Sequence, residues 1–490
     1  MAQANDIAQY ALDLVNRFRM DPAGSFDRFI ANAVTSAAHD PGVTAALAWF
    51  KVDLAALEAQ LSALSPVAPL AWEDRLADAA AGHNKAMQAA DLQSHQVPGE
   101  LSLGGRVDAT GYDWRALAEN VYAYAENPDH AHAGFIIDWG YDTGETAATR
   151  SGGDGIQDPA GHRDALMVAR YRQIGIDFLA DSTGATKVGP WLTTQVMGDP
   201  VDKAPRLLGV VHDDGDFDGA YSMGEGVGGV SVSVTGGASG ATAAAGGYAL
   251  ATRAGTQELT FAGGGLGQAV VLRIAMAADN VKIDLADGGR VSVSADAELL
   301  SGATELRALG IIGLTLRGGD AAERIMGAAG DDILHGEDGE DRLMGKAGFD
   351  TLHGGKRTDV LFGGAQGDEM HGGRGWDRMF GGQGDDAMFG DRGNDEMRGG
   401  NGRDRITGGD GDDMLSGGRG RDVFVFDTAD GVDHILDWES KDRIDLRAHG
   451  ITPSEVTIDT RGEDAVLLIG LTTVFIHGAA GDFNEGALLF

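Results

Sequence analysis

The stretch Gly336-Glu337-Asp338-Gly339-Glu340-Asp341-Arg342-Leu343-Met344 is one copy of a pattern that recurs every nine residues from residue 318 to residue 426. Residues 372–380 and 408–416 are two further copies. Each copy is rich in glycine at its start and carries an acidic residue at its sixth position. The aspartates at this position are Asp332, Asp341, Asp350, Asp359, Asp368, Asp377, Asp386, Asp395, Asp404, Asp413 and Asp422.

An apolar residue follows each aspartate by two positions, and this spacing predicts the fold. The last three residues of a copy form a short strand with the apolar side chain pointing inward, and the first six form a tight turn in which glycine supplies positive φ. Stacked copies predict a parallel β-roll, because one copy alone buries almost nothing. The turns gather carboxylates and carbonyls into all-oxygen cages that suit Ca²⁺. The predicted core residues are Leu334, Leu343, Leu352, Leu361, Met370, Met379, Met388, Met397, Ile406, Leu415 and Phe424.

The repeat Gly-Gly-x-Gly-x-Asp-x-apolar-x resembles that of RTX (repeat-in-toxin) proteins, which type I secretion exports from Gram-negative bacteria. The resemblance implies several bound Ca²⁺ ions and the type I secretion machinery as a partner. Glu323 replaces aspartate in the first copy, and Arg357 and Gln366 replace the fourth-position glycine, which puts the sites around Asp359 and Asp368 in question. A disordered linker is the alternative, but a linker has no reason to keep an apolar residue in phase.

The composition limits the classes of partner. The chain has 490 residues, enough for two to four domains, and a formal net charge of −37. Because the chain has no basic stripe, we do not expect it to bind nucleic acid. An anionic membrane surface is not expected either, unless Ca²⁺ bridges the two. The chain contains no cysteine, which excludes disulfides and cysteine nucleophiles.

The two ends of the chain bear on export. Residues 1–19 predict an amphipathic helix and show no cleavable signal. No apolar run reaches the roughly 18 residues of a transmembrane segment. Residues 427–490 resemble the capping strands that follow RTX repeats. They end in an acidic and then apolar tail, residues 482–490, that is similar to a type I secretion signal. We therefore expect a secreted, extracellular protein.

Residues 1–200 carry the candidate chemistry. The apolar positions from Leu47 to Leu64 step by three and four and predict one helix, and a further helix is expected from about Glu73 to Ala90. His83 lies on the apolar face of that helix, so we expect it to be a packed core histidine rather than a ligand.

Four short motifs follow in order: Ser94-His95, Ala118-Glu119-Asn120, Trp139 with Asp142 three positions later, and Gly161-His162-Arg163-Asp164. Their order resembles the CAP superfamily (cysteine-rich secretory proteins, antigen 5, pathogenesis-related 1) over about residues 6–198. The resemblance implies an α-β-α sandwich. It also implies a cleft lined by His95, Glu119, Asp142 and His162. Asp142 has the shorter carboxylate, and Glu145 could substitute for it. An insertion at about residues 143–160 could reshape the cleft.

The chemistry of this set leaves alternatives open. Two neutral imidazoles with carboxylates could bind Zn²⁺, and water on such a metal could be a nucleophile. The catalytic candidates would be His95, Glu119 and His162. The same set could instead form a polar cleft that binds a ligand without turnover, or it could have a purely structural role. Because CAP members are associated with hydrolysis only rarely, we expect binding of a metal, a small ligand or an extracellular partner more than catalysis.

Residues 205–275 contain a second calcium motif. Asp214, Asp216, Asp218 and Glu225 fit the Asp-x-Asp-x-Asp-Gly-x₅-Glu loop. Alternating residues from Val227 to Val234 predict a strand. The segment resembles the small β-sandwich repeats of bacterial surface adhesins. A solvated acidic turn without an ion is the alternative.

The expected order is therefore a CAP-like domain at 1–200, a β-sandwich at 205–275, lead-in strands that cap the roll at 276–317, the β-roll at 318–426, and a cap with secretion signal at 427–490. The expected function is that of a secreted calcium-binding protein whose CAP domain binds a metal, a ligand or an extracellular partner. The alternatives are a metal-dependent extracellular hydrolase and a calcium-dependent surface adhesion protein.

Overall fold

The structure is a computed structural model that describes residues 5–139, 156–157, 160–181, 188–216, 218, 220–426, 430–447, 451–479, 481, 483 and 485–490. The chain divides into two compact units. One comprises Met1–Ala269 and Ala275–Gly288, and the other Val270–Ile274 and Gly289–Phe490. Of the helices in the described ranges, none is long and apolar enough to cross a membrane.

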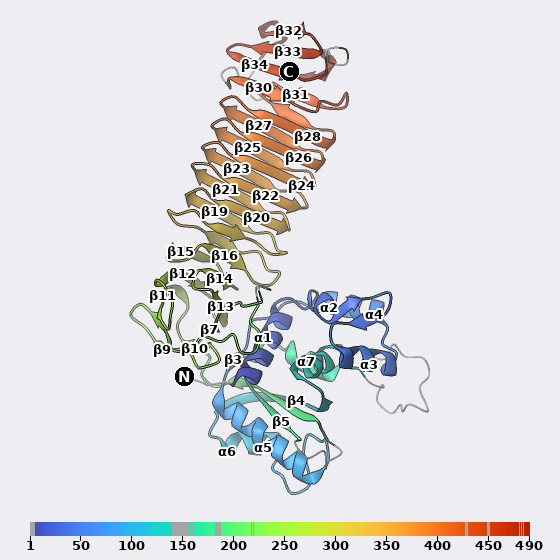
Figure 1. Cartoon of the computed structure of the whole chain (residues 1–490), viewed down its shortest axis with the longest axis vertical. Coiled ribbons are helices and arrows are strands. Elements are labelled where there is room, and N and C mark those ends of the chain that lie inside the picture. Colours follow the sequence, from blue (N-terminus) through green and yellow to red (C-terminus); the bar gives the residue numbers. More distant parts are fainter. Residues whose placement is uncertain are drawn as a thin grey trace. The chain divides into compact units, whose positions relative to one another are not determined.

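A four-stranded sheet forms the centre of the N-terminal part, with strand order β3-β5-β6-β4. β5 pairs in parallel with β3 and antiparallel with β6, which is antiparallel to β4 (Figure 1). The elements are α1 (Asp6–Met20), α2 (Ser25–Phe29), β1 (Ile30–Asn32), β2 (Ala37–Ala38), α3 (Pro41–Phe50), α4 (Leu54–Ser62), β3 (Ala71–Trp72), α5 (Asp74–Ala90), α6 (Leu103–Ala109), β4 (Trp114–Ala125), α7 (Pro128–Ile137), α8 (Gly161–Leu166), β5 (Gln173–Ala180) and β6 (Trp191–Pro200).

Helices cover both faces of this sheet. Leu76 of α5 and Val107 of α6 pack against Val196 of β6 on one face. A separate cluster contains Phe18 of α1 and Ile174 of β5. Gly175 lets α5 approach β5 closely, because a side chain there would overlap the backbone of Ala77. The predicted N-terminal α/β fold is confirmed.

One predicted helix is in fact two. The apolar stripe that starts at Leu47 is divided between α3 and α4, and Leu64 follows the end of α4. Lys51 adopts a left-handed conformation after α3, and the Asp53 carboxylate accepts hydrogen bonds from two backbone N–H groups at the start of α4. The N-cap aspartate starts a new helix in the middle of the apolar pattern. The spacing of apolar residues alone does not predict this break.

Two groups of paired strands follow in the same unit. β7 lies between β10 and β13, and β8 lies between β11 and β9. Tyr248 of β10 contacts Phe261 of β11 with ring centroids 5.6 Å apart. The β13 strand, which lies in the stretch expected to lead into the roll, pairs in parallel with β7. The strands are β7 (Arg206–His212), β8 (Val230–Val234), β9 (Ser239–Ala241), β10 (Gly247–Ala251), β11 (Gly255–Gly263) and β13 (Val281–Ala286).

The second unit contains the predicted β-roll. Even-numbered strands form one parallel sheet and odd-numbered strands the other, and each strand pairs with the strand two copies later, as Leu334 does with Leu352. The inward apolar residues from Leu334 to Phe424 are completely buried. The roll strands are β17 (Thr315–Arg317), β18 (Arg324–Met326), β19 (Ile333–Asp338), β20 (Arg342–Ala347), β21 (Thr351–Lys356), β22 (Val360–Ala365), β23 (Glu369–Arg374), β24 (Arg378–Gln383), β25 (Ala387–Arg392), β26 (Glu396–Gly402), β27 (Arg405–Asp410), β28 (Met414–Gly420) and β29 (Val423–Val425).

Most roll strands are longer than the predicted three residues. A strand such as β19 continues through the two positions after its first glycine, because Glu337 pairs with Gly355 and Asp338 with Lys356. The strands before the roll are β12 (Val270–Met276), β14 (Arg290–Val293), β15 (Ala297–Ser301) and β16 (Glu305–Ala308). Those after it are β30 (Val432–Ile435), β31 (Arg443–Asp445), β32 (Val456–Arg461), β33 (Asp464–Ile469), β34 (Thr472–Ile476) and β35 (Leu488–Leu489).

Candidate functional site

The aspartates of the roll form two hydrogen-bonded ladders. The backbone N–H of Asp359 donates to Oδ1 of Asp377, and the N–H of Asp377 donates to Oδ1 of Asp395, each over 2.8 Å. The same bond recurs at every turn and fixes each carboxylate by one oxygen. One ladder runs through Asp332, Asp350, Asp368, Asp386, Asp404, Asp422 and Asp442, and the other through Glu323, Asp341, Asp359, Asp377, Asp395, Asp413 and Asp433.

The second oxygen of most of these carboxylates is buried without a hydrogen-bond partner. At Gly372 an added Cβ would lie 2.7 Å from Oδ2 of Asp377 and 2.9 Å from the carbonyl oxygen of Gly390, so these two oxygens converge on one space. Buried oxygens that lack donors are costly, and converging carboxylate and carbonyl oxygens are what Ca²⁺ prefers. The donor set therefore fits calcium. The unpartnered Oδ2 atoms belong to Asp341, Asp350, Asp359, Asp368, Asp377, Asp386, Asp395, Asp404, Asp413, Asp422 and Asp433.

Burial makes these carboxylates hard to ionise without a cation. It raises the pKa of Asp359 and of Asp395 to about 8, and neighbouring aspartates add to the rise. Burial likewise raises the pKa of Asp377 to about 6. A bound divalent cation would favour the ionised form of each group.

The copies that depart from the repeat keep this geometry. Arg357 and Gln366 adopt the positive φ that glycine supplies elsewhere, at 77° and 73°. Asp359 and Asp368 accept their ladder bonds over 2.8 and 2.9 Å and keep an unpartnered Oδ2. Glu323 donates its backbone N–H to Asp341 in the same way. The backbone therefore tolerates the replaced glycines, and occupancy of these sites stays a prediction.

Two ladder members were missed in the sequence. Asp433 and Asp442 follow their partners Asp413 and Asp422 by 20 residues instead of 18. The two extra residues break the nine-residue register. The remaining signal is an aspartate within one strand-like segment, β30, and another directly before the next, β31.

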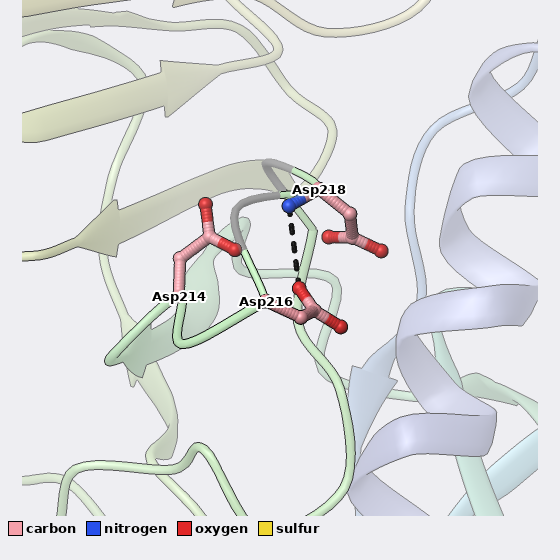
Figure 2. Close-up of side chains that lie close together, drawn as sticks. All are labelled: Asp214, Asp216 and Asp218. Atoms are coloured by element: carbon pink, nitrogen blue, oxygen red, sulfur yellow. Dashed lines mark hydrogen bonds between the residues drawn. The ribbon is translucent and has the colours of Figure 1, made fainter.

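Figure 2 shows the three aspartates of the second calcium motif. Asp214, Asp216 and Asp218 each offer a carboxylate oxygen within 4.8 Å of the others. Glu225, the expected closing ligand, instead accepts hydrogen bonds from the backbone N–H groups of Gly215 (3.0 Å) and Ser222 (2.8 Å). The loop therefore brings together three of the four predicted ligands and holds the fourth on its own backbone.

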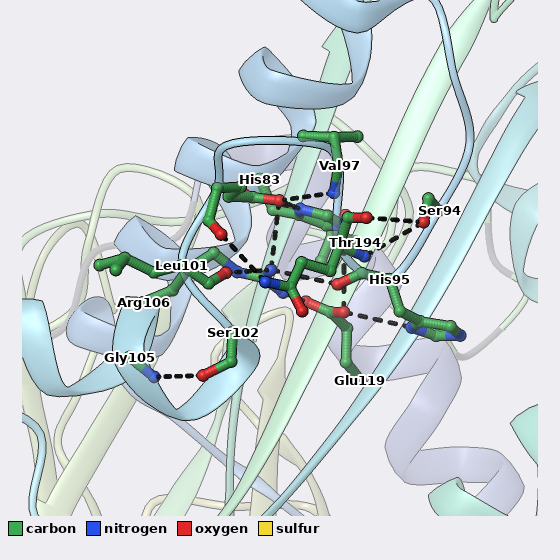
Figure 3. Close-up of polar contacts among 12 residues, drawn as sticks. His83, Ser94, His95, Val97, Leu101, Ser102, Gly105, Arg106, Glu119 and Thr194 are labelled. Carbon is green, nitrogen blue, oxygen red and sulfur yellow. Dashed lines mark hydrogen bonds and ion pairs between the residues drawn. The ribbon is translucent and has the colours of Figure 1, made fainter.

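The predicted cleft residue Glu119 lies in a buried polar cluster between β4, α5 and α6 (Figure 3). His95 Nδ1 lies 3.2 Å from Oε2 of Glu119, and the Arg106 guanidinium contacts Oε1. Arg106 also contacts Glu100 over 3.3 Å and donates to the carbonyl oxygen of His95 over 3.1 Å. Sequence reasoning missed Arg106 and Glu100, which belong to no motif.

His83, predicted as a packed histidine, is fully buried in this cluster. Its Nδ1 lies 2.8 Å from Glu100 Oε1, and its Nε2 lies 3.9 Å from Glu119 Oε2 without a hydrogen-bond partner. His83 is therefore a polar member of the cluster as well as a buried residue.

His162, at the start of α8, has a different carboxylate partner. Its Nδ1 lies 2.7 Å from Oδ1 of Asp138, and its backbone N–H donates to Oδ2 over 2.9 Å. Asn120 of β4 donates to the His162 carbonyl oxygen over 3.1 Å. Asp142 and Glu145 lie outside the described residues. Within the described ranges, Asp214, Asp216 and Asp218 are the only group of three candidate metal ligands within 4.8 Å of one another.

Comparison with known protein families gives matches in two parts of the chain. The family model for RTX calcium-binding nonapeptide repeats matches residues 317–352, 353–388 and 389–424. The model for the cysteine-rich secretory protein (CAP) family matches residues 12–196. A search of curated proteins gave no match. The chain therefore carries a CAP domain and RTX calcium-binding repeats, as the resemblances implied.

Two solved structures show weak likeness. One is an extracellular protein containing an SCP domain from Bacillus anthracis str. Ames, with 22% identity over 27% of this chain and 34% of that one, and a TM-score of 0.20. The other is the extracellular lipase LipA from Serratia marcescens, with 16% identity over 36% of this chain and 40% of that one, and a TM-score of 0.18. The chain thus spans about a third of the first structure and two fifths of the second.

Proposed function

We propose that this is a secreted calcium-binding protein in which the RTX roll serves export and folding, and the CAP domain binds a polar ligand or an extracellular partner without turnover. The type I secretion machinery is the export partner. Where Ca²⁺ is scarce, the roll stays unfolded and can thread the exporter. Millimolar Ca²⁺ outside the cell suits weak sites of this kind and folds the roll.

One observation carries this proposal. Eleven buried aspartates, divided between the two ladders, keep an Oδ2 without a hydrogen-bond partner. Such an arrangement is unfavourable unless cations neutralise it. The net charge of −37 adds repulsion that bound ions relieve.

The experiment is a Ca²⁺ titration of the full chain after treatment with a chelator, followed by far-UV circular dichroism and by counting bound Ca²⁺. A gain of β signal at millimolar Ca²⁺, with several ions bound, supports the proposal. Mg²⁺ at the same concentration is the control, because it tolerates a flexible oxygen cage poorly. Identical spectra with chelator and with Ca²⁺ would refute it.

Zinc-dependent hydrolysis is the second candidate for the cleft. His95 and His162 each direct Nδ1 toward a carboxylate, which leaves Nε2 available, as in many histidines that ligate metals. The test is metal-dependent hydrolysis by the full chain beside the variant His95→Ala/His162→Ala. Equal activity of the two proteins would exclude this candidate.

Calcium-dependent adhesion is the third candidate, and the carboxylates of Asp214, Asp216 and Asp218 favour it. An Asp214→Asn/Asp216→Asn variant should lose Ca²⁺-dependent cell attachment while the roll still folds. Unchanged attachment would remove the loop from any adhesive role.

A further inference from the structure

The Arg106 guanidinium stands inside a ring of side chains that could serve as metal ligands. Glu100 and Glu119 contact it, and His83 lies between the same two carboxylates. His95 contacts Glu119 from the more open side, with 61% of its side chain exposed. Arg106 is buried, at 6% side-chain exposure, and comes from α6 (Figure 3).

This ring has the composition of a divalent metal site. Two carboxylates with two imidazoles are donors that Zn²⁺ accepts. The buried Nε2 of His83 has no hydrogen-bond partner and lies 3.9 Å from Glu119. The arginine, however, already places a permanent positive charge beside both carboxylates and donates a hydrogen bond to Glu119. A metal ion here would have to displace a buried guanidinium.

We propose that Arg106 is the resident cation of this cluster: it neutralises Glu100 and Glu119 and closes the ring to divalent metals, so that the CAP domain takes an organic ligand rather than a metal at this place. This inference rests on the proposed ligand-binding role of the CAP domain. Arg106 is thus a specificity-determining residue. Its hydrogen bond to the His95 carbonyl oxygen also holds the segment that presents the exposed imidazole.

The test uses the full chain saturated with Ca²⁺, with Co²⁺ as the probe. Co²⁺ bound by imidazole in a four-coordinate site absorbs visible light strongly, whereas Co²⁺ in all-oxygen six-coordinate sites absorbs weakly, so the calcium sites do not interfere. Wild type should show no strong band. Arg106→Gln should gain a strong band, which Zn²⁺ abolishes and a further His83→Ala change removes. Arg106→Lys keeps the positive charge and should gain none.

Arg106→Met is the second variant in case Arg106→Gln does not fold, and thermal unfolding checks both. A strong band in either folded variant supports the proposal, and a folded variant without one contradicts it. A strong band in the protein with Arg106 intact that His83→Ala or His95→Ala removes overturns the proposal. That result would overturn the inference about Arg106 but not the proposed function, because the roll would still fold with Ca²⁺. If folding of the roll does not depend on Ca²⁺, the proposed function is refuted, and the Co²⁺ result is unchanged.

Discussion

At the scale of single residues, the roll depends on pairing an aspartate with a glycine. The aspartate fixes one carboxylate oxygen in the ladder and leaves the other for a cation, as Asp377 does. The glycine keeps open the space where that oxygen meets a carbonyl, as Gly372 does. The charge of the aspartate and the space beside the glycine can therefore be tested by separate substitutions.

Gly372→Ala tests the space. The new methyl group would lie 2.7 Å from Asp377 Oδ2, so we expect weaker Ca²⁺ binding at this turn and a loss of about 1–3 kcal/mol in the stability of the Ca²⁺-bound roll. Ca²⁺ titration with thermal unfolding measures both. Gly82→Ala on α5 is the control, because nothing lies within 4 Å of an added Cβ there. If Gly372→Ala binds Ca²⁺ like wild type, the carbonyl cradle is not the site.

Asp377→Asn tests the charge. The amide keeps the shape of the side chain but is a weaker ligand for Ca²⁺, so the number of bound ions should fall. Asp385→Asn is the matched control, because Asp385 is an exposed neighbour that pairs with Arg403 over 2.6 Å. Calorimetric titration should show fewer sites in the first variant alone. A loss of equal size in both would mean that net charge, and not the ladder, governs binding.

At the scale of elements, α1 and β13 are tied by a buried ion network. Lys282 of β13 contacts Asp13 of α1 over 2.8 Å, and both side chains are almost completely buried. Asp284 contacts Lys282, and Arg17 contacts Asp13 over 2.5 Å. The strand and the first helix should therefore unfold together.

Lys282→Met should destabilise the first unit by roughly 3–5 kcal/mol, because it leaves buried carboxylates with fewer cations. Lys203→Met removes a half-exposed ammonium group from the buried Asp199 and should cost less than Lys282→Met, because water already screens the charge of Lys203. Thermal unfolding in saturating Ca²⁺ compares the two. Similar melting temperatures would show that the network does not couple α1 to β13.

The α7 helix carries a buried histidine with a clear pH consequence. Burial lowers the pKa of His132 to about 3, and neither ring nitrogen has a hydrogen-bond partner. Because the folded-state pKa lies below the unfolded value of about 6.5, stability is unaffected above pH 6.5 and falls as the pH drops toward 3. The slope from this group is at most about 1.4 kcal/mol per pH unit.

In His132→Leu the free energy of unfolding should fall less between pH 6.5 and pH 4, since the variant has no imidazole to protonate at this position. Unfolding of the full chain by urea at pH values from 7 to 4 measures the effect, with the exposed His39→Gln as control. If the free energy of unfolding of His132→Leu falls with pH as steeply as that of wild type, the pH dependence belongs to other groups.

At the scale of the whole molecule, periodicity was the most informative signal. An apolar residue every nine positions predicted the roll core from Leu334 to Phe424 without exception. Features that depend on contacts distant in the sequence were missed. Arg106 meets Glu119 across 13 residues and His162 meets Asp138 across 24, and no motif spacing encodes either pair. Assignment of the cleft residues to a ligand or metal stays a prediction.

Hydrogen–deuterium exchange of the full chain, with millimolar Ca²⁺ and with chelator, tests the central claim most directly. We expect amides of β19 to β28 to be protected in Ca²⁺ and to exchange rapidly in chelator, while amides of α5 and β6 are protected in both. Roll amides that stay equally protected in chelator would contradict the claim that calcium folds the roll.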